Sequence, residues 1–418
     1  MSSRKRNILL VHYGDNWIRG SEQTLLSLVD NLDRCRFTPF VWSNNPRLHQ
    51  QLQQRNVGSF LSPFKVLLGW QKPRFAIFSW LQQCLQAYRL IKENNIDLVH
   101  VNGGAPCQWM WLVCRLCGIP MLLHLHSDYP LRDRLTLGFG LATQVVTVSN
   151  AISHSLLKDG YPQQRQKTIY NGFSGQQDQQ PVFDVKKHLG LDSSTFLLVS
   201  CGSLIQRKGM DLLIRAMASV RKHDQGVHLL IIGGGPEYHS LLTLARQLDI
   251  TDHIHFSGEQ SNVPRWMAGC DAFVSGASSE AFGLVIGEAT LAGLAVIAPA
   301  TGGIPELVQH NVSALLYTKG SQAQLAQHIV SLRGETDVAR RLTTNARQRI
   351  TTKFTVQHYI SAFQSEYQRL LCTPVSPPSI GSFIATALRT TLAHITDPLS
   401  NHLNFRLNLI MKNSQKRF

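Results

Sequence analysis

Short apolar runs that alternate with helix-like stretches are the feature that most constrains the fold of this chain. In the first third, such runs lie at residues 7–14, 37–43, 96–104, 121–127 and 144–150. Residues 21–32 and 151–160 between and after them show helical spacing of apolar side chains. Apolar strands bounded by helices are typical of a parallel sheet covered on both faces. We therefore expect an α/β protein.

The pattern is interrupted once and then restarts. Residues 170–183, YNGFSGQQDQQPVF, are rich in glutamine and have no periodicity, and new strand and helix patterns follow them. Two doubly wound units predict two Rossmann-like domains facing each other across a cleft. The expected division is a first domain at 1–172, a linker at 173–190, a second domain at 191–355, a helix at 356–372 that crosses back to the first domain, and a basic amphipathic tail at 373–418.

The net charge narrows the class of partner. The chain has 418 residues with 41 Lys and Arg against 26 Asp and Glu, a formal net charge of +15 at pH 7. Such an excess favours nucleotides, nucleic acid or an anionic membrane surface, and a basic solvated surface without a partner is the alternative. Hydrophobic residues at 43% and charged residues at 16% exclude a disordered chain.

Targeting signals are not evident. The apolar run in MSSRKRNILLVHYG is too short for a secretory signal, and no run reaches the roughly 18 apolar residues that span a bilayer. We therefore expect a cytoplasmic protein, with peripheral contact on the inner face of the membrane. The tail at 373–418 carries five Lys or Arg and one acidic residue, which suits a segment lying on anionic lipid. A helix packed on the protein body, or an unordered tail, is the alternative.

The eight cysteines do not form a metal or disulfide pattern. Only Cys114 and Cys117 have metal or redox spacing, and they lie in the apolar stretch WMWLVCRLCG with no second pair elsewhere. We expect them to be packing residues, and we expect no metal site.

Two basic residues mark a candidate phosphate site in the second domain. In CGSLIQRKGMDLLIRA a strand ends at Cys201, a loop presents Arg207 and Lys208, and a helix begins near Met210. Basic side chains beside a helix N-terminus, at the carboxyl edge of a sheet, bind phosphate groups. A solvated loop is the alternative.

Two glutamates eight positions apart mark a second candidate site. In SEAFGLVIGEATLAG, Glu280 is expected in the loop after a strand, and residues 281–285 in the first turn of a helix whose free N–H groups would hold a diphosphate. Glu288 is expected about two turns inside that helix. A carboxylate accepts two hydroxyl hydrogen bonds, so it suits a ribose or a sugar diol.

This stretch carries a family resemblance. Residues 278–308, SSEAFGLVIGEATLAGLAVIAPATGGIPELV, resemble the E-x7-E signature of retaining nucleotide-sugar glycosyltransferases of the GT-B fold, usually called family 4. The likeness extends over GSLIQRKGMDLLIRA, IIGGGPE and HIHFSGE, and more weakly over RGSEQTLLSLV, LVHVNGG, LHLHSDYP, VVTVSNAI and IYNGFS. It covers roughly residues 7–372.

The resemblance assigns most of a donor site to the second domain. Lys208 would contact the donor diphosphate, assisted by Arg207. Glu280 would hold hydroxyls of the transferred sugar, and Glu288 would bind the ribose diol. Backbone amides for the sugar and the phosphates would come from the segment between the glutamates: Phe282, Gly283, Leu284 and Val285.

The resemblance also implies residues of the first domain. Gly20 would lie in a glycine loop that approaches the diphosphate and the acceptor, and His126 matches a histidine near the donor sugar. A histidine on an apolar strand is otherwise a structural residue. The catalytic residues implied are His126, Lys208 and Glu280.

The chain departs from the family pattern at two positions. Ser203 stands in the donor site where the family often has arginine, so one diphosphate contact is lost, and Arg207 would offset it. Arg19 stands where the glycine loop usually has a second glycine. These departures indicate an unusual acceptor or a weakened donor site.

The reaction implied by the resemblance is transfer of a hexosyl group from a UDP- or GDP-sugar to a hydroxyl of a glycan or lipid-linked acceptor, with retention, in cell-surface polysaccharide or lipopolysaccharide assembly. No Asp-x-Asp signature follows a strand, so neither a metal ion nor a cofactor is expected. A nucleic-acid partner is not expected, because no recognised binding motif is present. The alternatives are a sugar-nucleotide epimerase, a basic nucleic-acid-binding protein and a non-catalytic relative.

Overall fold

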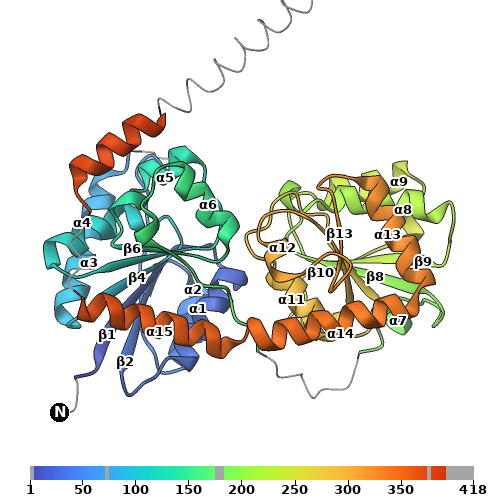
Figure 1. Cartoon of the computed structure of the whole chain (residues 1–418), viewed down its shortest axis with the longest axis horizontal. Helices are drawn as coiled ribbons and strands as arrows, with labels where there is room; N and C mark the ends of the chain where they lie inside the picture. Colours follow the sequence, from blue (N-terminus) through green and yellow to red (C-terminus); the bar gives the residue numbers. More distant parts are fainter. Residues whose placement is uncertain (1–3, 71–74, 175–182, 374–377, 392–418) are drawn as a thin grey trace, which may run out of the picture.

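Two α/β halves lie side by side, each with a parallel sheet between helices (Figure 1). The structure is a computed structural model that describes residues 4–70, 75–174, 183–373 and 378–391. The expected fold class, two Rossmann-like units, is confirmed.

The N-terminal half is built on a seven-stranded parallel sheet with the order β3-β2-β1-β4-β5-β6-β7. Its strands are β1 (Arg6–His12), β2 (Phe37–Ser43), β3 (Gly58–Leu61), β4 (Leu98–Asn102), β5 (Met121–Leu125), β6 (Gln144–Thr147) and β7 (Gln166–Thr168). Every residue of β4, β5 and β6 is buried, because helices cover both faces. The strand order reverses between β1 and β4, and sheets of this kind bind ligands beyond the carboxyl ends at such a point.

The helices of this half begin and end at residues suited to those positions. They are α1 (Gly20–Asn31), α2 (Pro46–Gln54), α3 (Ile77–Glu93), α4 (Cys107–Cys117), α5 (Leu131–Thr136) and α6 (Asn150–Lys158). Asn45 caps α2 by accepting the Leu48 N–H at 3.0 Å, and α4 ends at Gly118 in the left-handed conformation. Cys114 is buried within α4 and Cys117 is partly buried, as expected for packing residues.

The C-terminal half repeats the arrangement with a six-stranded parallel sheet in the order β10-β9-β8-β11-β12-β13. Its strands are β8 (Phe196–Cys201), β9 (Val227–Ile232), β10 (Ile254–Gly258), β11 (Ala272–Val274), β12 (Ala295–Pro299) and β13 (Leu315–Tyr317). The order reverses between β8 and β11. The loops after these two strands carry Lys208 and Glu280 respectively, which brings them to one edge of the sheet.

Packed structure resumes inside the interval 173–190 that the sequence predicted as a linker. Helix α7 (Val185–His188) lies there, Val185 is fully buried, and Lys186 pairs with Asp271 at 2.9 Å. Residues 175–182 of that interval lie outside the described residues. The other helices that begin in this half are α8 (Met210–Arg221), α9 (Tyr238–Gln247), α10 (Val263–Met267), α11 (Leu284–Leu291), α12 (Ile304–Leu307), α13 (Gln322–Gly334) and α14 (Thr336–Lys353).

The last long helix, α15 (Val356–Cys372), continues from α14 and lies on the N-terminal half (Figure 1). Tyr359, Phe363 and Tyr367 are buried in the same hydrophobic cluster as the apolar face of α1. Because α15 packs on one half while α14 packs on the other, the two helices tie the halves together.

The chain beyond α15 is described only over residues 378–391, of which 380–391 are helical. This segment packs on the N-terminal half: Arg115 donates to the Pro378 carbonyl at 2.8 Å, and the Thr390 hydroxyl donates to the Asp159 carbonyl at 2.9 Å. The rest of the predicted amphipathic tail, residues 392–418, lies outside the described residues. None of the helices described is long and apolar enough to cross a membrane.

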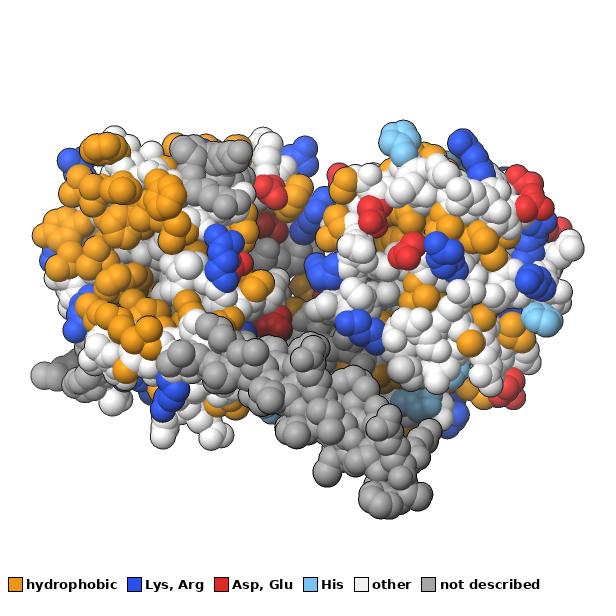
Figure 2. Space-filling model, turned by 90° about the horizontal axis from the view of Figure 1, so that it is seen from above, with side chains coloured by type: hydrophobic (Ala, Val, Ile, Leu, Met, Phe, Trp, Pro, Cys, Tyr) orange, Lys and Arg blue, Asp and Glu red, His pale blue; other side chains and the backbone are white. Residues whose placement is uncertain are grey.

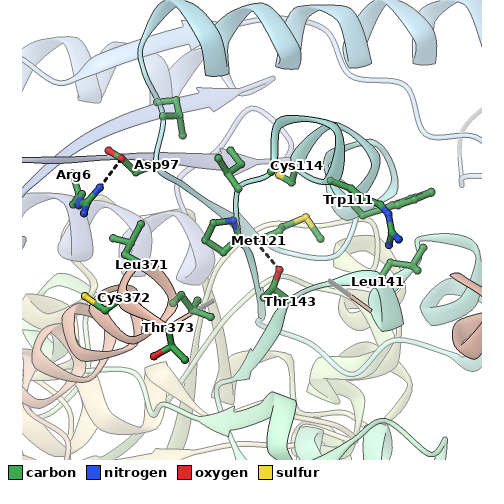
Figure 3. Close-up of a pocket in the computed structure, with 16 residues that line it drawn as sticks. Arg6, Asp97, Trp111, Cys114, Met121, Leu141, Thr143, Leu371, Cys372 and Thr373 are labelled. Carbon is green, nitrogen blue, oxygen red and sulfur yellow. Dashed lines mark hydrogen bonds and ion pairs between the residues drawn. The ribbon is translucent and has the colours of Figure 1, made fainter. Parts of the chain in front are cut away.

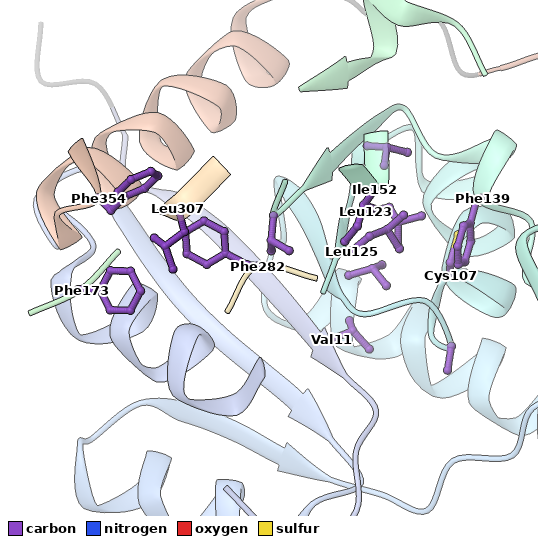
Figure 4. Close-up of a cluster of buried hydrophobic side chains, with 14 of the residues drawn as sticks. Val11, Cys107, Leu123, Leu125, Phe139, Ile152, Phe173, Phe282, Leu307 and Phe354 are labelled. Carbon is purple, nitrogen blue, oxygen red and sulfur yellow. The ribbon is translucent and has the colours of Figure 1, made fainter. Parts of the chain in front are cut away.

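An aromatic cluster joins the halves where the chain crosses between them. The Phe282 ring lies 5.8 Å from Tyr170, 6.1 Å from Phe173 and 5.7 Å from Phe354. Figure 4 shows Phe173, Phe282, Leu307 and Phe354 gathered beside the crossing, apart from the buried side chains of the first sheet. The Phe173 N–H also donates to the Phe354 carbonyl at 2.8 Å. The cluster therefore packs the segment after Glu280 against the two places where the chain passes between the halves, near Phe173 and near Phe354.

Candidate active site

A cleft of about 1340 Å³ lies between the carboxyl ends of the two sheets. Figure 2 shows Lys and Arg side chains on both sides of the gap between the halves. All of the site residues predicted from the sequence line this cleft: Gly20, His126, Ser203, Arg207, Lys208, Glu280, Phe282, Gly283, Leu284, Val285 and Glu288. The fold thus brings together residues from four segments that lie far apart in the sequence.

Lys208 and Glu280 contact each other directly. The Lys208 Nζ lies 2.6 Å from the Glu280 Oε2, and the two side chains are only 18% and 15% exposed. Lys208 ends a short 3-10 turn (Gln206–Lys208) directly before α8, and Gly209 in the left-handed conformation makes the bend between them. The cation predicted to bind phosphate therefore pairs with the carboxylate predicted to bind sugar.

Arg207 is directed to a different partner. Its guanidinium donates to the Ser279 carbonyl at 2.9 Å, and its own carbonyl accepts the Ser278 N–H at 2.9 Å. Arg207 is exposed at the rim of the cleft and pins the strand-to-helix loop that carries Glu280.

Helix α11 begins later than the sequence predicted. It starts at Leu284, with Gly283 at φ 101° before it, so residues 281 and 282 form bends and the segment 281–283 lies outside the first turn. Glycine is required at this point because other residues avoid the left-handed region. The N–H groups of Leu284 and Val285 lie in the first turn, where a helix leaves its amides unpaired. The Phe282 side chain is buried in the aromatic cluster, so only its backbone can serve the cleft.

Glu288 lies one turn into α11 rather than two, because the helix starts later than expected. Burial raises the pKa of the Glu288 carboxyl above its ordinary value. No hydrogen bond joins its side chain to another of the described residues. A partly buried carboxylate that lines the cleft without a partner is suited to receive two ligand hydroxyls.

The sequence analysis gave no role to Gly302 and Gly303, yet they hold the Glu280 loop. Gly302 has φ 54°, and a Cβ built on it would lie 1.8 Å from the Glu280 carbonyl oxygen. The Gly303 N–H donates to that same oxygen at 3.0 Å. The GG of GGIPELV was visible in the sequence, but its contact with a residue 22 positions earlier was not.

His126 belongs to a buried polar group at the end of the first sheet. Its Nε2 lies 2.8 Å from the Asn102 Oδ1, a residue that the sequence analysis did not single out. Burial, aided by the neighbouring His12, lowers the pKa of His126 to about 3. The imidazole is therefore neutral near pH 7. Because the Asn102 oxygen can only accept, the ring proton is assigned to Nε2, which leaves Nδ1 as an acceptor.

Asn171 is a further cleft residue that the sequence analysis missed. It is 2% exposed, and its Oδ1 is buried without a partner among the described residues. It lines the cleft near His126 and Phe282, in the IYNGFS segment. An unpaired buried acceptor is costly, so a ligand hydroxyl or N–H at this place would be favoured.

Arg19 and Ser203, the two departures from the family pattern, meet across the cleft. The Arg19 Nη1 donates to the Ser203 Oγ at 2.8 Å, although the residues belong to different halves. The spacing of Arg19 and Ser203 in the sequence does not predict that their side chains lie close together.

The described residues contain no group of three or more His, Cys, Asp or Glu side chains arranged to hold a metal ion. A second pocket of about 470 Å³ lies at the amino ends of β1, β4 and β5, the opposite edge of the first sheet from the cleft. Figure 3 shows Arg6 paired with Asp97 on one side of it and Trp111 and Leu141 on the other. It contains none of the predicted site residues.

Comparison with known proteins identifies the family. A family model described as "Glycosyl transferases group 1" matches residues 183–349, and one described as "Glycosyltransferase Family 4" matches residues 18–175. Together they take in most of the chain. The chain therefore belongs to the group 1 glycosyltransferases of the GT-B fold.

Individual relatives agree with this assignment. The chain is 26% identical over 299 residues to N-acetyl-alpha-D-glucosaminyl L-malate synthase of Bacillus anthracis, covering 67% of this chain and 76% of the relative. It is 29% identical over 286 residues to the GDP-mannose-dependent alpha-(1-6)-phosphatidylinositol monomannoside mannosyltransferase of Mycobacterium tuberculosis, covering 64% and 74%. A crystal structure of HepE from Anabaena, in complex with UDP and glucose, is similar in fold with a TM-score of 0.75 and 22% identity, covering 86% and 99%.

These findings make the chain an enzyme, a hexosyltransferase. The epimerase, nucleic-acid-binding and non-catalytic alternatives do not fit this assignment.

Proposed function

We propose that the chain transfers a hexosyl group, with retention, from a nucleoside diphosphate sugar to a hydroxyl of a glycan or lipid-linked acceptor. The observation that carries the proposal is the Lys208–Glu280 pair beside the start of α11, inside the cleft between two Rossmann-like sheets. A cation and unpaired helix amides suit a diphosphate, and the carboxylate suits sugar hydroxyls. We place the reaction in cell-surface polysaccharide or lipopolysaccharide assembly.

Donor binding would exchange the partners of this pair. The diphosphate would take Lys208 together with the N–H groups of Leu284 and Val285, and Glu280 would turn to the transferred sugar. Glu288 would receive the ribose diol. Negative charge develops on the leaving diphosphate in the transition state, so a fixed cation and helix dipole at that place lower the barrier.

Retention is proposed through attack on the same face that the diphosphate leaves. In this reading the leaving phosphate oxygen takes the proton of the acceptor hydroxyl, so that no carboxylate nucleophile is needed. Glu280 and Glu288 are then binding residues, and the neutral His126 serves as a hydrogen-bonding group rather than as an acid. A metal ion is not required in this mechanism.

The experiment is a screen of UDP-, GDP- and ADP-sugars for thermal stabilisation, followed by NMR of the product. The proposal expects one donor to raise the melting temperature, and the product to keep the anomeric configuration of the donor. Inversion of the configuration would overturn the retaining mechanism. Stabilisation by none of the donors would overturn the proposed donor site.

An anionic membrane surface is proposed as the place where a lipid-linked acceptor is met. Helix α3 carries five large apolar or aromatic side chains outward: Ile77, Phe78, Leu81, Leu85 and Tyr88 are 45–85% exposed. We call these five residues the α3 apolar stripe. Figure 2 shows hydrophobic side chains gathered over the outer part of the N-terminal half. Arg89 and Lys92 are exposed at the end of the same helix, where they suit anionic headgroups.

Two aromatic residues of the same half, Trp70 and Tyr13, lie near the carboxyl end of β1. Trp70 is 48% exposed, its ring lies 6.4 Å from Tyr13, and Tyr13 directly follows the last residue of β1. We propose that the head group of a lipid-linked acceptor held in the bilayer reaches the carboxyl edge of the first sheet. Association of two copies through the stripe is the competing outcome, and sedimentation of the free protein would detect it.

A further inference from the structure

Arg19 occupies a fixed position at the start of α1. Its backbone N–H donates to the Glu22 Oε2 at 3.0 Å, and the Glu22 Oε1 lies 2.8 Å from the Nε2 of His12, the last residue of β1. Glu22 and His12 are both buried. Burial opposes ionisation of Glu22, but the His12 contact and the Arg19 N–H outweigh it and lower the pKa of the carboxyl. The base of the Arg19 side chain is thus anchored to the first sheet.

The Arg19 side chain reaches the other half. Its Nη1 donates to the Ser203 Oγ at 2.8 Å, and its Nη2 lies 3.2 Å from the Glu259 Oε1. The guanidinium carbon lies 3.8 Å from the centre of the Trp17 ring. Stacking on an aromatic face orients a guanidinium while its N–H edge stays available for hydrogen bonds.

The guanidinium lies beside the cations and amides proposed for the diphosphate. Ser203 follows Gly202, and a Cβ built on Gly202 would lie 3.6 Å from the Cδ and Cε of Lys208. Gly20 follows Arg19, and a Cβ built on it would lie 3.0 Å from the Leu284 Cδ1. The pair Arg19 and Gly20 therefore lies next to two parts of the proposed diphosphate site: the loop that carries Lys208 and the start of α11.

We infer that Arg19 binds the donor diphosphate, supplying from the N-terminal half a guanidinium that the Ser203 loop itself lacks. The inference rests on the proposed function. Arginine binds phosphate through paired, charge-assisted hydrogen bonds, whereas in the structure the guanidinium makes one contact with the Ser203 hydroxyl and one with the exposed Glu259 carboxylate. Glu259 is 67% exposed, so releasing Arg19 from it costs little. Because Lys208 and Arg19 belong to different halves, a diphosphate between them would hold the cleft closed.

The test measures binding of UDP, GDP and ADP by titration calorimetry to the full chain and to Arg19→Ala. We expect the dissociation constant of the nucleotide that binds to rise roughly tenfold to hundredfold, the range for a hydrogen-bonded charge. The matched control is Arg34→Ala, which removes the same charge near the other end of α1, where the guanidinium donates to the Val29 carbonyl at 2.9 Å. It should bind the nucleotide as the unchanged chain does.

A swap variant separates the guanidinium from the loop. Since the Arg19 Nη1 lies within 2.8 Å of the Ser203 Oγ, an arginine at position 203 can place its charge in the same space. The double variant Arg19→Gly/Ser203→Arg should recover binding to within a few-fold of the unchanged chain.

The outcomes are distinguishable. If the unchanged chain binds none of UDP, GDP and ADP, the proposed function fails. If it binds one of them and Arg19→Ala binds equally well, the inference about Arg19 alone fails. If the folded swap variant binds as weakly as Arg19→Ala, the loop rather than the guanidinium is responsible, and the inference is again overturned.

Discussion

Two variants of the Lys208–Glu280 pair should distinguish its contribution to folding stability from its contribution to catalysis. In Lys208→Met the side chain keeps its length but loses its cation, and Glu280 is left without its partner at 2.6 Å. Loss of one partner from a fully buried pair costs about 3–5 kcal/mol, and exposed pairs are worth about 0.2–1 kcal/mol. With the side chains 18% and 15% exposed, we expect an intermediate loss of about 2–3 kcal/mol.

The second variant in this cycle removes both charges. Lys208→Met/Glu280→Gln leaves no uncompensated carboxylate, so it should recover most of the lost stability. Activity should not recover, because the cation that stabilises the leaving diphosphate is still absent. Loss of one such group typically lowers kcat by about 10²–10³.

The assay pairs thermal unfolding with initial rates at saturating donor. For a half of this size, each kcal/mol corresponds to roughly 2–4 °C in the melting temperature, so Lys208→Met should melt roughly 4–12 °C lower. The matched control is Lys186→Met, which breaks a comparable pair with Asp271 at 2.9 Å outside the cleft. It should lower the melting temperature while leaving kcat unchanged. Activity in the double variant near that of the unchanged chain would refute the assignment of Lys208 to the diphosphate.

Three further predictions follow from single features. Burial raises the pKa of Glu288, so stability is lost as the pH rises from the ordinary glutamate pKa through that raised pKa, and the full cost is present above it. Glu288→Gln should therefore raise the melting temperature of the ligand-free chain at pH 8 but not at pH 4, while nucleotide-sugar affinity falls. Gly302→Ala should lower kcat at least tenfold, because its Cβ would clash with the Glu280 carbonyl. Gly320→Ala is its control, since Gly320 has φ 78° and open space around it, and costs only the left-handed strain of about 1–2 kcal/mol. Phe78→Glu/Leu85→Glu should abolish co-sedimentation with vesicles containing phosphatidylglycerol. Val330→Glu, on an exposed apolar side chain of α13, should leave it intact, and binding that survives in the double variant would exclude the α3 apolar stripe.

The strands and the loops that follow them could be predicted because their signals are local. A buried strand of a parallel sheet shows in the sequence as a continuous apolar run. Because β8 and β11 are parallel neighbours at the point where the strand order reverses, the loops that follow them lie at the same edge of the sheet. For that reason Lys208, Glu280 and Gly283 were placed together correctly from the sequence. The binding roles of these residues stay predictions.

What the sequence could not predict depends on contacts between distant segments or on the backbone conformation of single residues. The start of α11 moved to Leu284 because Gly283 takes the left-handed conformation, and this shift brings Glu288 within one turn of the start. The contact of Gly302 with Glu280 and that of Arg19 with Ser203 join segments whose spacing carries no periodic signal. The outward direction of the α3 apolar stripe was also missed. The spacing of its apolar residues is that of a helix whether the apolar face is buried or exposed, so the spacing does not tell which face meets water.

The electrostatics of the cleft connect these observations. Lys208 and Arg19, two cations near the start of α11, each have a carboxylate partner in the structure: Lys208 with Glu280 at 2.6 Å and Arg19 with Glu259 at 3.2 Å. A diphosphate brings charges of the same sign as these carboxylates, so it can replace both of them without leaving either cation unpaired. Glu259 then returns to solvent at little cost, because it is largely exposed, whereas Glu280 is mostly buried and needs a new partner. Hydroxyls of the transferred sugar meet that need, and a nucleoside diphosphate without a sugar does not. The same argument predicts that the sugar contributes to affinity through Glu280. Glu280→Gln should therefore reduce the preference for the nucleotide sugar over the free nucleotide, and an unchanged preference would contradict it.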